Sequence, residues 1–261
     1  MSPRIVGVIP SRWGSTRFPG KSLAPIAGRP LLARVIDRVR LATRLDAVWV
    51  ATDDERIAAA ARDAGAEPVM TPSDLPSGTD RVAYALRGRE ADIVVNIQGD
   101  EPLLDPAAVD NVAAALADDP AWDMATAATP VESADDLHSP DVVKVVRAAD
   151  GAALYFSRSV IPYVRGAAPG FPPTPGVHLR HIGLYAYRRT FLERLVATPP
   201  SPLEQLEKLE QLRALQLGCR MKVLDAPTPS LCPRAAAPWR RRPWHRSCPR
   251  RRGAQAACSL N

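Results

Sequence analysis

Short apolar runs alternate with segments of helical apolar spacing through the first 120 residues, and this alternation limits the possible folds more than any other feature. Residues 92–97 form the clearest buried strand, because Ile and Val fill four of the six positions. The alternation predicts an α/β fold with a doubly wound, mostly parallel sheet. The other expected elements of this half are strands at residues 5–9, 47–52 and 67–70, and helices at residues 30–42, 54–64, 106–116 and after Gly78.

The order of elements changes beyond about residue 120. Residues 142–147 and 152–156 are predicted strands, and Asp150-Gly151 between them fits a hairpin turn, so we place this pair outside the parallel core. The Pro- and Gly-rich residues 162–175 predict a mobile loop. The remaining expected elements are strands at residues 124–131, 179–187 and 220–224, and one helix over residues 202–217 that ends at Gly218.

The first predicted strand opens into a loop rich in groups that bind phosphate. Residues 10–21 read Pro-Ser-Arg-Trp-Gly-Ser-Thr-Arg-Phe-Pro-Gly-Lys, with cations at positions 12, 17 and 21. Glycines let backbone N–H groups turn toward an anion, and arginine and lysine neutralise its charge. The loop therefore predicts a triphosphate site, although its spacing differs from the ATPase phosphate loop. A solvated basic turn is the simpler alternative.

A second polar loop follows the strongest predicted strand. Residues 96–102 read Asn-Ile-Gln-Gly-Asp-Glu-Pro, and they leave the carboxyl end of the strand, where open α/β sheets bind their ligands. Asp100 is the expected ligand of a hard cation such as Mg²⁺, and Gly99 leaves room for a close approach. Alternatively, Asp100 and Glu101 are acids that favour the start of the next helix through its dipole.

A third loop, residues 76–81, places small donors at the start of a predicted helix. Its sequence, Pro-Ser-Gly-Thr-Asp-Arg, suits a nucleotide base edge or a phosphate. It is equally suited to ordinary helix capping, and the spacing does not decide between these interpretations.

The basic character of the chain is concentrated in its last 35 residues. Residues 227–261 hold eight of the 34 basic residues and no acidic residue, which leaves 26 basic and 28 acidic residues in the rest. A nucleic-acid partner would therefore rest on this tail alone, and we do not expect one.

Neither a leader nor a membrane span is expected. The N-terminus lacks a charged segment followed by a long apolar run, and no stretch approaches the roughly 18 to 20 apolar residues of a span. The cysteines begin only at Cys219 and lack CxxC spacing, which argues against a disulfide framework or a zinc knuckle. We therefore expect a cytoplasmic protein.

Seven motifs resemble, in order, those of the 3-deoxy-manno-octulosonate cytidylyltransferases, over roughly residues 4–226. Single motifs also occur in other sugar cytidylyltransferases, whereas the full set is typical of this family. The motifs are I-P-S-R with S-T-R-F-P-G-K (residues 9–12 and 15–21), A-T-D (51–53), S-G-T-D-R (77–81), N-I-Q-G-D-E-P (96–102), L-Y-F-S-R (154–158), L-R-H-I-G-L-Y-A-Y-R (179–188) and S-P-L-E-Q-L-E (201–207).

The resemblance implies a reaction in which the anomeric hydroxyl of the acid sugar 3-deoxy-D-manno-octulosonate (Kdo) attacks the α-phosphate of CTP. The products are CMP-Kdo, for lipopolysaccharide synthesis, and pyrophosphate. Mg²⁺ is the implied cofactor. Such a transfer needs in-line positioning and charge neutralisation without a covalent enzyme intermediate.

The resemblance also implies roles for individual residues. Arg12, Lys21 and Asp100 match catalytic positions, with Asp100 as a metal ligand. The implied CTP-binding residues are Pro10, Ser11, Arg12, Lys21, Ser77, Gly78, Arg81 and Asp100, and the implied sugar-binding residues are Gln98, His181, Tyr185 and Glu204. Each sugar-side residue has a structural alternative, as an interior histidine, a strand aromatic or a first-turn helix acid.

The implied organisation is a cytidylyltransferase domain over residues 1–226 that dimerises with a second copy through the hairpin and sugar-binding region at about 140–190. The nearest alternative activity is transfer to another sugar acid, such as a sialic acid.

Residues 227–261 depart from the family. After Asp225 the family continues into a loop that carries a second metal-binding aspartate and then a final helix, whereas this chain continues into a sequence rich in Arg and Pro. Such a sequence predicts disorder. We hypothesise a frameshift near residue 230, which resequencing of the gene would test. The alternative to an active enzyme is then an inactive family member whose basic tail binds nucleic acid non-specifically.

Overall fold

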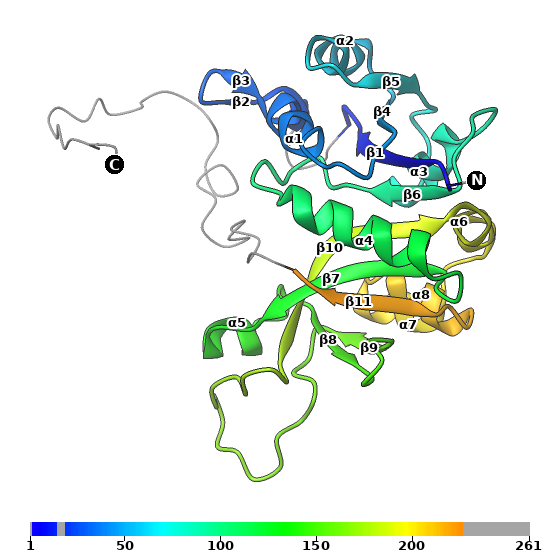
Figure 1. Ribbon diagram of the computed structural model, residues 1–261. Helices are drawn as coiled ribbons and strands as arrows, with labels where there is room; N and C mark the ends of the chain where they lie inside the picture. The colour runs from blue at the N-terminus through cyan, green and yellow to red at the C-terminus, as the bar shows by residue number, and fades with distance from the viewer. Residues whose placement is uncertain (1, 15–18, 227–261) are drawn as a thin grey trace, which may run out of the picture. The chain divides into compact units, whose positions relative to one another are not determined.

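Seven strands form the main path of one mixed sheet, in the order β11-β7-β10-β6-β1-β4-β5 (Figure 1). In this computed structural model, which describes residues 2–14 and 19–226, β10 is antiparallel to both of its neighbours and the other pairs on the path are parallel. The predicted doubly wound, mostly parallel α/β sheet is confirmed. The strands are β1 (Ile5–Ser11), β4 (Ala47–Thr52), β5 (Glu67–Met70), β6 (Ile93–Asn96), β7 (Met124–Pro130), β10 (Leu179–Arg188) and β11 (Met221–Asp225).

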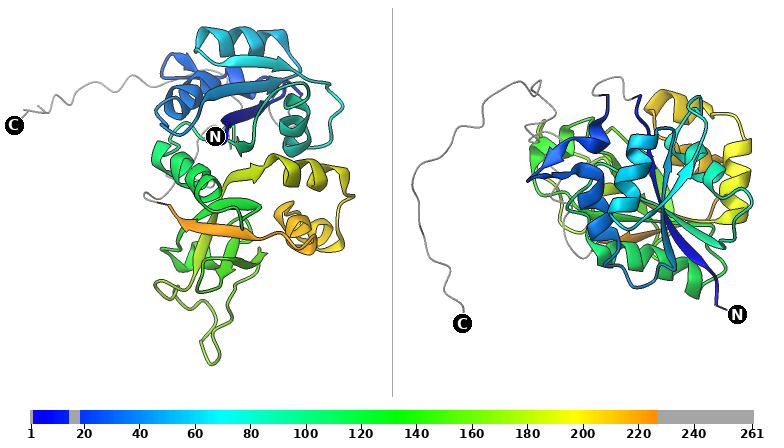
Figure 2. Two further views of the ribbon diagram at one scale, coloured as in Figure 1. Left: turned by 45° about the vertical axis from the view of Figure 1, so that its right-hand side comes forward. Right: turned by 90° about the horizontal axis from the view of Figure 1, so that it is seen from above.

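Helices cover both faces of this sheet (Figure 2). Helices α1 (Leu31–Val39), α2 (Glu55–Asp63) and α4 (Pro106–Asp118) pack on one face, and α3 (Gly78–Ala85), α6 (Arg189–Ala197) and α8 (Gln211–Gln216) pack on the other. The apolar stripe of α1 is fully buried at Leu32, Val35 and Ile36. Since apolar side chains recur at helical spacing, burial of one stripe against the sheet stabilises each helix.

The predicted hairpin is formed by β8 (Lys144–Arg147) and β9 (Ala153–Ser157). Gly151 in its turn has φ of +85°, a conformation that favours glycine. Strand β8 pairs with the beginning of β10, and the hairpin turn contacts the outer edge of β11, where Gly151 O accepts a 2.8 Å bond from Val223 N. The hairpin therefore lies outside the parallel core, as predicted.

The prediction of a single helix over residues 202–217 is wrong. The chain instead forms α7 (Pro202–Glu207) and then α8, with Lys208 in the left-handed region at φ +54°. The guanidinium of Arg158 donates a 2.6 Å bond to the carbonyl of Glu207, and Lys208 closes α7 in the manner of a C-cap.

Several short elements were not predicted from the sequence. Helix α6 begins at the residue after β10, so no turn signal separates the two. Helix α5 (Ala134–His138), the 3₁₀ turn η1 (Lys21–Leu23) and the small pair β2 (Pro25–Ile26) and β3 (Arg29–Pro30) were also missed.

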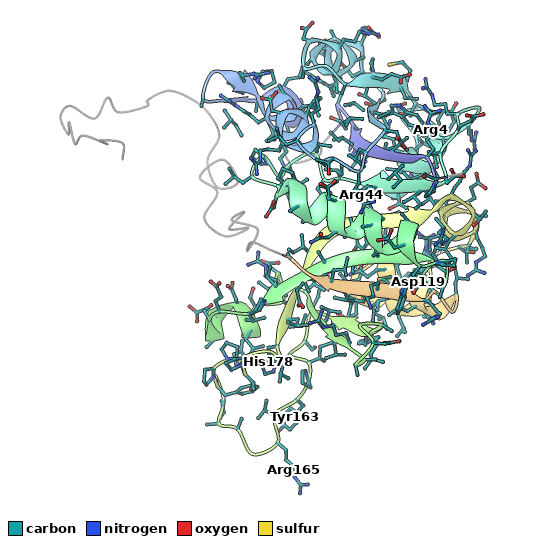
Figure 3. All side chains as sticks on the ribbon, viewed as in Figure 1. Arg4, Arg44, Asp119, Tyr163, Arg165 and His178 are labelled. Atoms are coloured by element: carbon teal, nitrogen blue, oxygen red, sulfur yellow. The ribbon has the colours of Figure 1, made fainter. Side chains whose placement is uncertain are left out.

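The connection between β9 and β10 contains no helix or strand, in agreement with the loop predicted over residues 162–175. Arg165 lies at its tip, away from the sheet, His178 lies at its base, and Tyr163 lies between the two (Figure 3). The His178 ring is buried, and its Nδ1 accepts a 2.7 Å bond from Thr174 N. The mobility of this loop stays a prediction.

Two sequence predictions fall outside the described residues. These are the third cation of the first loop, Arg17, and the disorder of the tail, residues 227–261. Within residues 2–14 and 19–226, no helix is both long and apolar enough to cross a membrane.

Candidate active site

The loops singled out in the sequence meet at the carboxyl ends of β1 and β6. The chain runs outward from β1 to β4 and β5 and then returns to β6 on the other side of β1, so this edge holds the topological switch point of the sheet. Open α/β sheets bind their ligands at this position. Pro10 lies at the centre of the meeting point. A Cβ added to Gly78 would lie 3.5 Å from Pro10 Cγ, and one added to Gly99 would lie 3.4 Å from Pro10 O.

Lys21 and Asp100 form an ion pair across this edge, with 2.6 Å between Nζ and Oδ2. Their side chains are 28% and 31% exposed, so both remain accessible to a ligand. The structure thus brings together a cation predicted to bind phosphate and the carboxylate predicted to bind a metal. An incoming phosphate would replace Asp100 as the partner of Lys21, and an incoming cation would replace Lys21 as the partner of Asp100.

Ser11 and Arg12, at the end of β1, differ in their exposure to solvent. Ser11 is buried, and its hydroxyl donates a 2.6 Å bond to Ser22 Oγ, which ties the end of β1 to η1. Arg12 is exposed, and its charge acts on Arg81, as described next. Of these two predicted CTP-binding residues, Arg12 presents its charge to solvent, whereas the Ser11 side chain supports the loop.

Asp53 belongs to one of the family-like motifs (A-T-D, residues 51–53), but no role was predicted for it from the sequence. Its carboxylate accepts a 3.0 Å bond from Trp13 N and lies 3.3 Å from Arg81 Nη2. Arg81 is 2% exposed and also donates to Thr71 Oγ1. Burial lowers the pKa of the Arg81 guanidinium, the nearby Arg12 charge adds to this effect, and Asp53 opposes it. Asp53 therefore joins the first loop to Arg81 in a buried network.

The signal that could have found Asp53 is its place directly after β4. Asp100 was found by the same argument after β6, and both carboxylates lie at the carboxyl edge of parallel strands.

In the loop before α3, the interpretation as a helix cap is confirmed. Ser77 Oγ accepts a 3.1 Å bond from Asp80 N and donates a 2.7 Å bond to Asp80 Oδ2. Gly78 is exposed beside Pro10, so the cap places the start of α3 against the end of β1. Binding of a base or a phosphate by Ser77 and Gly78 stays a prediction.

Three of the four predicted sugar-binding residues gather on β10 and the end of β6. His181 Nε2 is 3.0 Å from Thr126 Oγ1, and the His181 ring centroid lies 5.3 Å from that of Tyr185. Tyr185 is opposite Asn96 of β6, and a Cβ on Gly183 would lie 3.7 Å from Gln98 Cγ. All three residues are half-buried, which is the exposure expected where a polar ligand meets a strand surface.

Glu204, the fourth predicted sugar residue, serves the fold in this structure. It forms a capping box with Ser201 at the start of α7, and its Oε2 lies 3.1 Å from Arg213 Nε. The Glu204 residue is 9% exposed and Arg213 is 6% exposed. The interpretation of Glu204 as a first-turn helix acid is confirmed, and its role toward a sugar stays a prediction.

The residues at this edge fit a divalent cation only in part. Asp100 offers the carboxylate oxygen that Mg²⁺ prefers, beside the small Gly99. Among the described residues, no group of three His, Cys, Asp or Glu side chains could hold a metal ion. Asp225, at the end of β11, is paired with Arg147 at 2.8 Å. The protein thus suits a metal that arrives with phosphate oxygens as its other ligands.

Comparison with known proteins identifies the family of this chain. The family model described as cytidylyltransferase matches residues 6–222. A 3-deoxy-manno-octulosonate cytidylyltransferase of Myxococcus xanthus is 52% identical over 218 residues, which cover 83% of this chain and 86% of the relative. The protein of the same name from Bdellovibrio bacteriovorus is 49% identical over 221 residues, which cover 85% of this chain and 89% of the relative.

A solved structure agrees with these relatives. It is described as CMP:2-keto-3-deoxy-manno-octonic acid synthetase complexed with CTP, and it superposes with a TM-score of 0.79 at 41% identity over 85% of this chain and 90% of its own. The motifs, the sheet order and these matches lead to one conclusion: the chain belongs to the 3-deoxy-manno-octulosonate cytidylyltransferase family of nucleotidyltransferases.

Proposed function

We propose that this protein transfers CMP from CTP to Kdo, releases pyrophosphate, and so supplies CMP-Kdo for lipopolysaccharide synthesis. The observation that carries the proposal is the accessible Lys21–Asp100 ion pair at the switch point of the sheet. It joins a cation that we assign to phosphate binding to a carboxylate that we assign to metal binding, in a chain that is 52% identical to a 3-deoxy-manno-octulosonate cytidylyltransferase.

Charge neutralisation is the main task of the phosphate side. Arg12 and Lys21 would bind the triphosphate oxygens and stabilise the negative charge that develops on pyrophosphate as it leaves. Asp100 would hold Mg²⁺, which, when bound, supplies further neutralisation of the phosphate charge. Lys21 would release Asp100 as it turns to the phosphates, because in the complex the phosphates would pair with Lys21 and Mg²⁺ would pair with Asp100.

Cytidine would lie over Pro10 and Ser11, against the start of α3. Ser77 and Gly78 would form this surface, because Gly78 lies beside Pro10. Arg81 supports the first loop through Asp53, which accepts a bond from Trp13 N. On the sugar side, Gln98, His181 and Tyr185 offer the mixture of donors and acceptors that a polyol with a carboxylate requires. Glu204, on α7, is the fourth residue that the family resemblance implies. The attacking hydroxyl needs only in-line placement on the α-phosphate, and no residue forms a covalent intermediate.

The test is pyrophosphate release by the purified chain with CTP, Kdo and Mg²⁺. We expect release that depends on Kdo and that falls at least about 100-fold in Asp100→Ala, the order of loss typical when a group that stabilises transition-state charge is removed. Asp63→Ala, an exposed carboxylate at the end of α2, is the control and should retain full activity.

A panel of acid sugars in the same assay decides specificity. Faster release with a sialic acid than with Kdo would contradict the substrate assignment. No release with any sugar from a folded protein would support the inactive, frameshifted member instead.

We also propose that the enzyme works as a homodimer in the cytoplasm, where nucleoside triphosphates are available. The hairpin offers a surface for a second copy, because Leu154 on β9 is 60% exposed. Exposed apolar side chains on an edge strand are typical of an association surface.

A further inference from the structure

The two ends of the first loop are closed onto each other by Trp13. The Trp13 carbonyl accepts a 3.1 Å bond from Gly20 N. Gly20 is buried with φ of +69°, and a Cβ at this position would lie 2.8 Å from Trp13 Cη2. The indole therefore packs directly against the Gly20 backbone, so position 20 requires glycine for its φ and for the space that Trp13 takes.

Arg56, at the start of α2, stacks on the same indole. Its Cζ lies 3.3 Å from the Trp13 ring centroid. Asp54 holds the guanidinium in place with two bonds, 2.9 Å from Nε to Oδ1 and 2.7 Å from Nη2 to Oδ2. Asp54 also caps α2 through the Arg56 N–H, and these contacts lower the pKa of its carboxyl. The cation is thus fixed over the ring by a bidentate ion pair.

A third attachment comes from the strand side. Trp13 N donates to Asp53, the residue directly after β4. The segment Asp53 to Arg56 therefore holds Trp13 by its backbone and by its ring, and Trp13 in turn holds Gly20. Arg12 precedes Trp13 and Lys21 follows Gly20 in the chain. These contacts therefore fix the backbone positions from which the side chains of both cations extend.

We propose that Trp13 and Arg56 form a positioning clamp that holds Arg12 and Lys21 at the spacing a nucleoside triphosphate requires. The clamp residues act through the two cations and need not touch the nucleotide. This inference rests on the proposed function, because it assumes that Arg12 and Lys21 bind the triphosphate. Without the clamp, the cations would have to be ordered during binding, and that ordering would reduce affinity. The affinity for the triphosphate should therefore decrease, whereas the affinity for cytidine should not change.

Calorimetric titration of CTP and of cytidine, without sugar, tests the clamp. We expect Trp13→Ala to raise the Kd of CTP about 10-fold and Arg56→Ala about 3- to 10-fold, in the range of a partly desolvated cation–π contact. The Kd of cytidine should change less than about 2-fold by the same argument. Trp13→Phe keeps an aromatic face and should restore most of the CTP affinity.

Two substitutions separate the clamp from simple charge. Arg56→Lys keeps the positive charge but loses the planar, bidentate guanidinium, so it should bind CTP as weakly as Arg56→Ala. Arg62→Ala removes an exposed arginine on the same helix, which pairs with the exposed Glu55 at 2.7 Å, and should leave CTP binding unchanged.

The outcomes separate the two proposals. Full CTP affinity in Arg56→Lys, or equal losses for CTP and cytidine, would overturn the clamp. The binding measurement needs no turnover, so a wild type that binds CTP but releases no pyrophosphate would contradict the proposed function and leave the clamp testable. If Trp13→Ala lowers the melting temperature, the exposed Arg56 variants carry the test.

Discussion

Asp53 and Asp100 each pair with a cation at the same edge of the sheet, but in different surroundings. The Asp53–Arg81 side chains are 9% and 2% exposed, whereas those of Asp100 and Lys21 are near 30%. A buried pair keeps its partners because a single charge left in the interior is costly, while an accessible pair can exchange them. Asp53 thus suits a fixed support and Asp100 suits a ligand site.

Asp53→Asn should destabilise the fold by about 3 kcal/mol, because it leaves the buried Arg81 guanidinium without its counter-ion. The free energy of unfolding in urea measures this change. Asp63→Asn, at an exposed position on α2, should change it by less than about 0.5 kcal/mol. A loss of similar size in both variants would contradict the assignment of Asp53 as a buried support.

The Asp54–Arg56 contact predicts a pH dependence. Arg56 lowers the pKa of the Asp54 carboxyl below its usual value of about 3.8. The contact therefore stabilises the folded state above that value and is lost as the pH falls through the lower, folded-state pKa. The difference in melting temperature between wild type and Asp54→Asn should be constant from about pH 5 to 8 and shrink below about pH 4. A difference that vanishes near pH 6 would contradict this assignment.

The sequence located Lys21 and Asp100 because both belong to loops that leave predicted strands. Trp13 and Arg56 could not be assigned from the sequence, since their contact joins residues 43 positions apart on separate elements. Nor could periodicity show that Glu204 is engaged by Arg213 rather than exposed to a ligand.

Among the elements, the region around β8 depends on one buried lysine. Lys144 is fully buried, and its Nζ donates to three carbonyls, those of Ser139 at 2.9 Å, Val142 at 2.6 Å and Arg158 at 2.5 Å. Burial lowers the pKa of this ammonium group. The lysine thus joins the start of β8 to the end of β9.

Lys144→Met should lower the free energy of unfolding by about 2 to 3 kcal/mol, because buried carbonyls lose their donor. Urea denaturation measures the loss, with the exposed Lys208→Met as the control. Equal stability of the two variants would show that water replaces the ammonium group.

The break between α7 and α8 shows why helix length was overestimated. Leucines at helical spacing run through residues 203–217 and favour one continuous helix. The donor that engages the Glu207 carbonyl, Arg158, lies 49 residues away, so local spacing carries no sign of it.

At the scale of the whole molecule, the parallel course of β1, β4, β5 and β6 followed from the alternating pattern. The antiparallel course of β10 between β6 and β7 did not, because pairing of distant strands leaves no local mark. The site nevertheless lies where the pattern predicts, since β1 and β6 are neighbours at the switch point.

The proposed homodimer gives a prediction at this scale. Leu154→Glu on β9 should convert the dimer to a monomer, because a charge would be buried in the contact. Sedimentation velocity measures the change. Leu41→Glu is the matched control, since Leu41 is also 60% exposed but follows α1. Unchanged association of Leu154→Glu would exclude the hairpin as the contact.

The contact of the hairpin with β11 has a consequence for solubility. Strand β11 ends the main path of the sheet, yet the outward N–H and C=O of Val223 bond to Gly151 O at 2.8 Å and to Arg147 Nη1 at 3.0 Å. An open strand edge is a template for aggregation. The hairpin occupies that template within the same chain, so its detachment would expose a strand on which other molecules could polymerise.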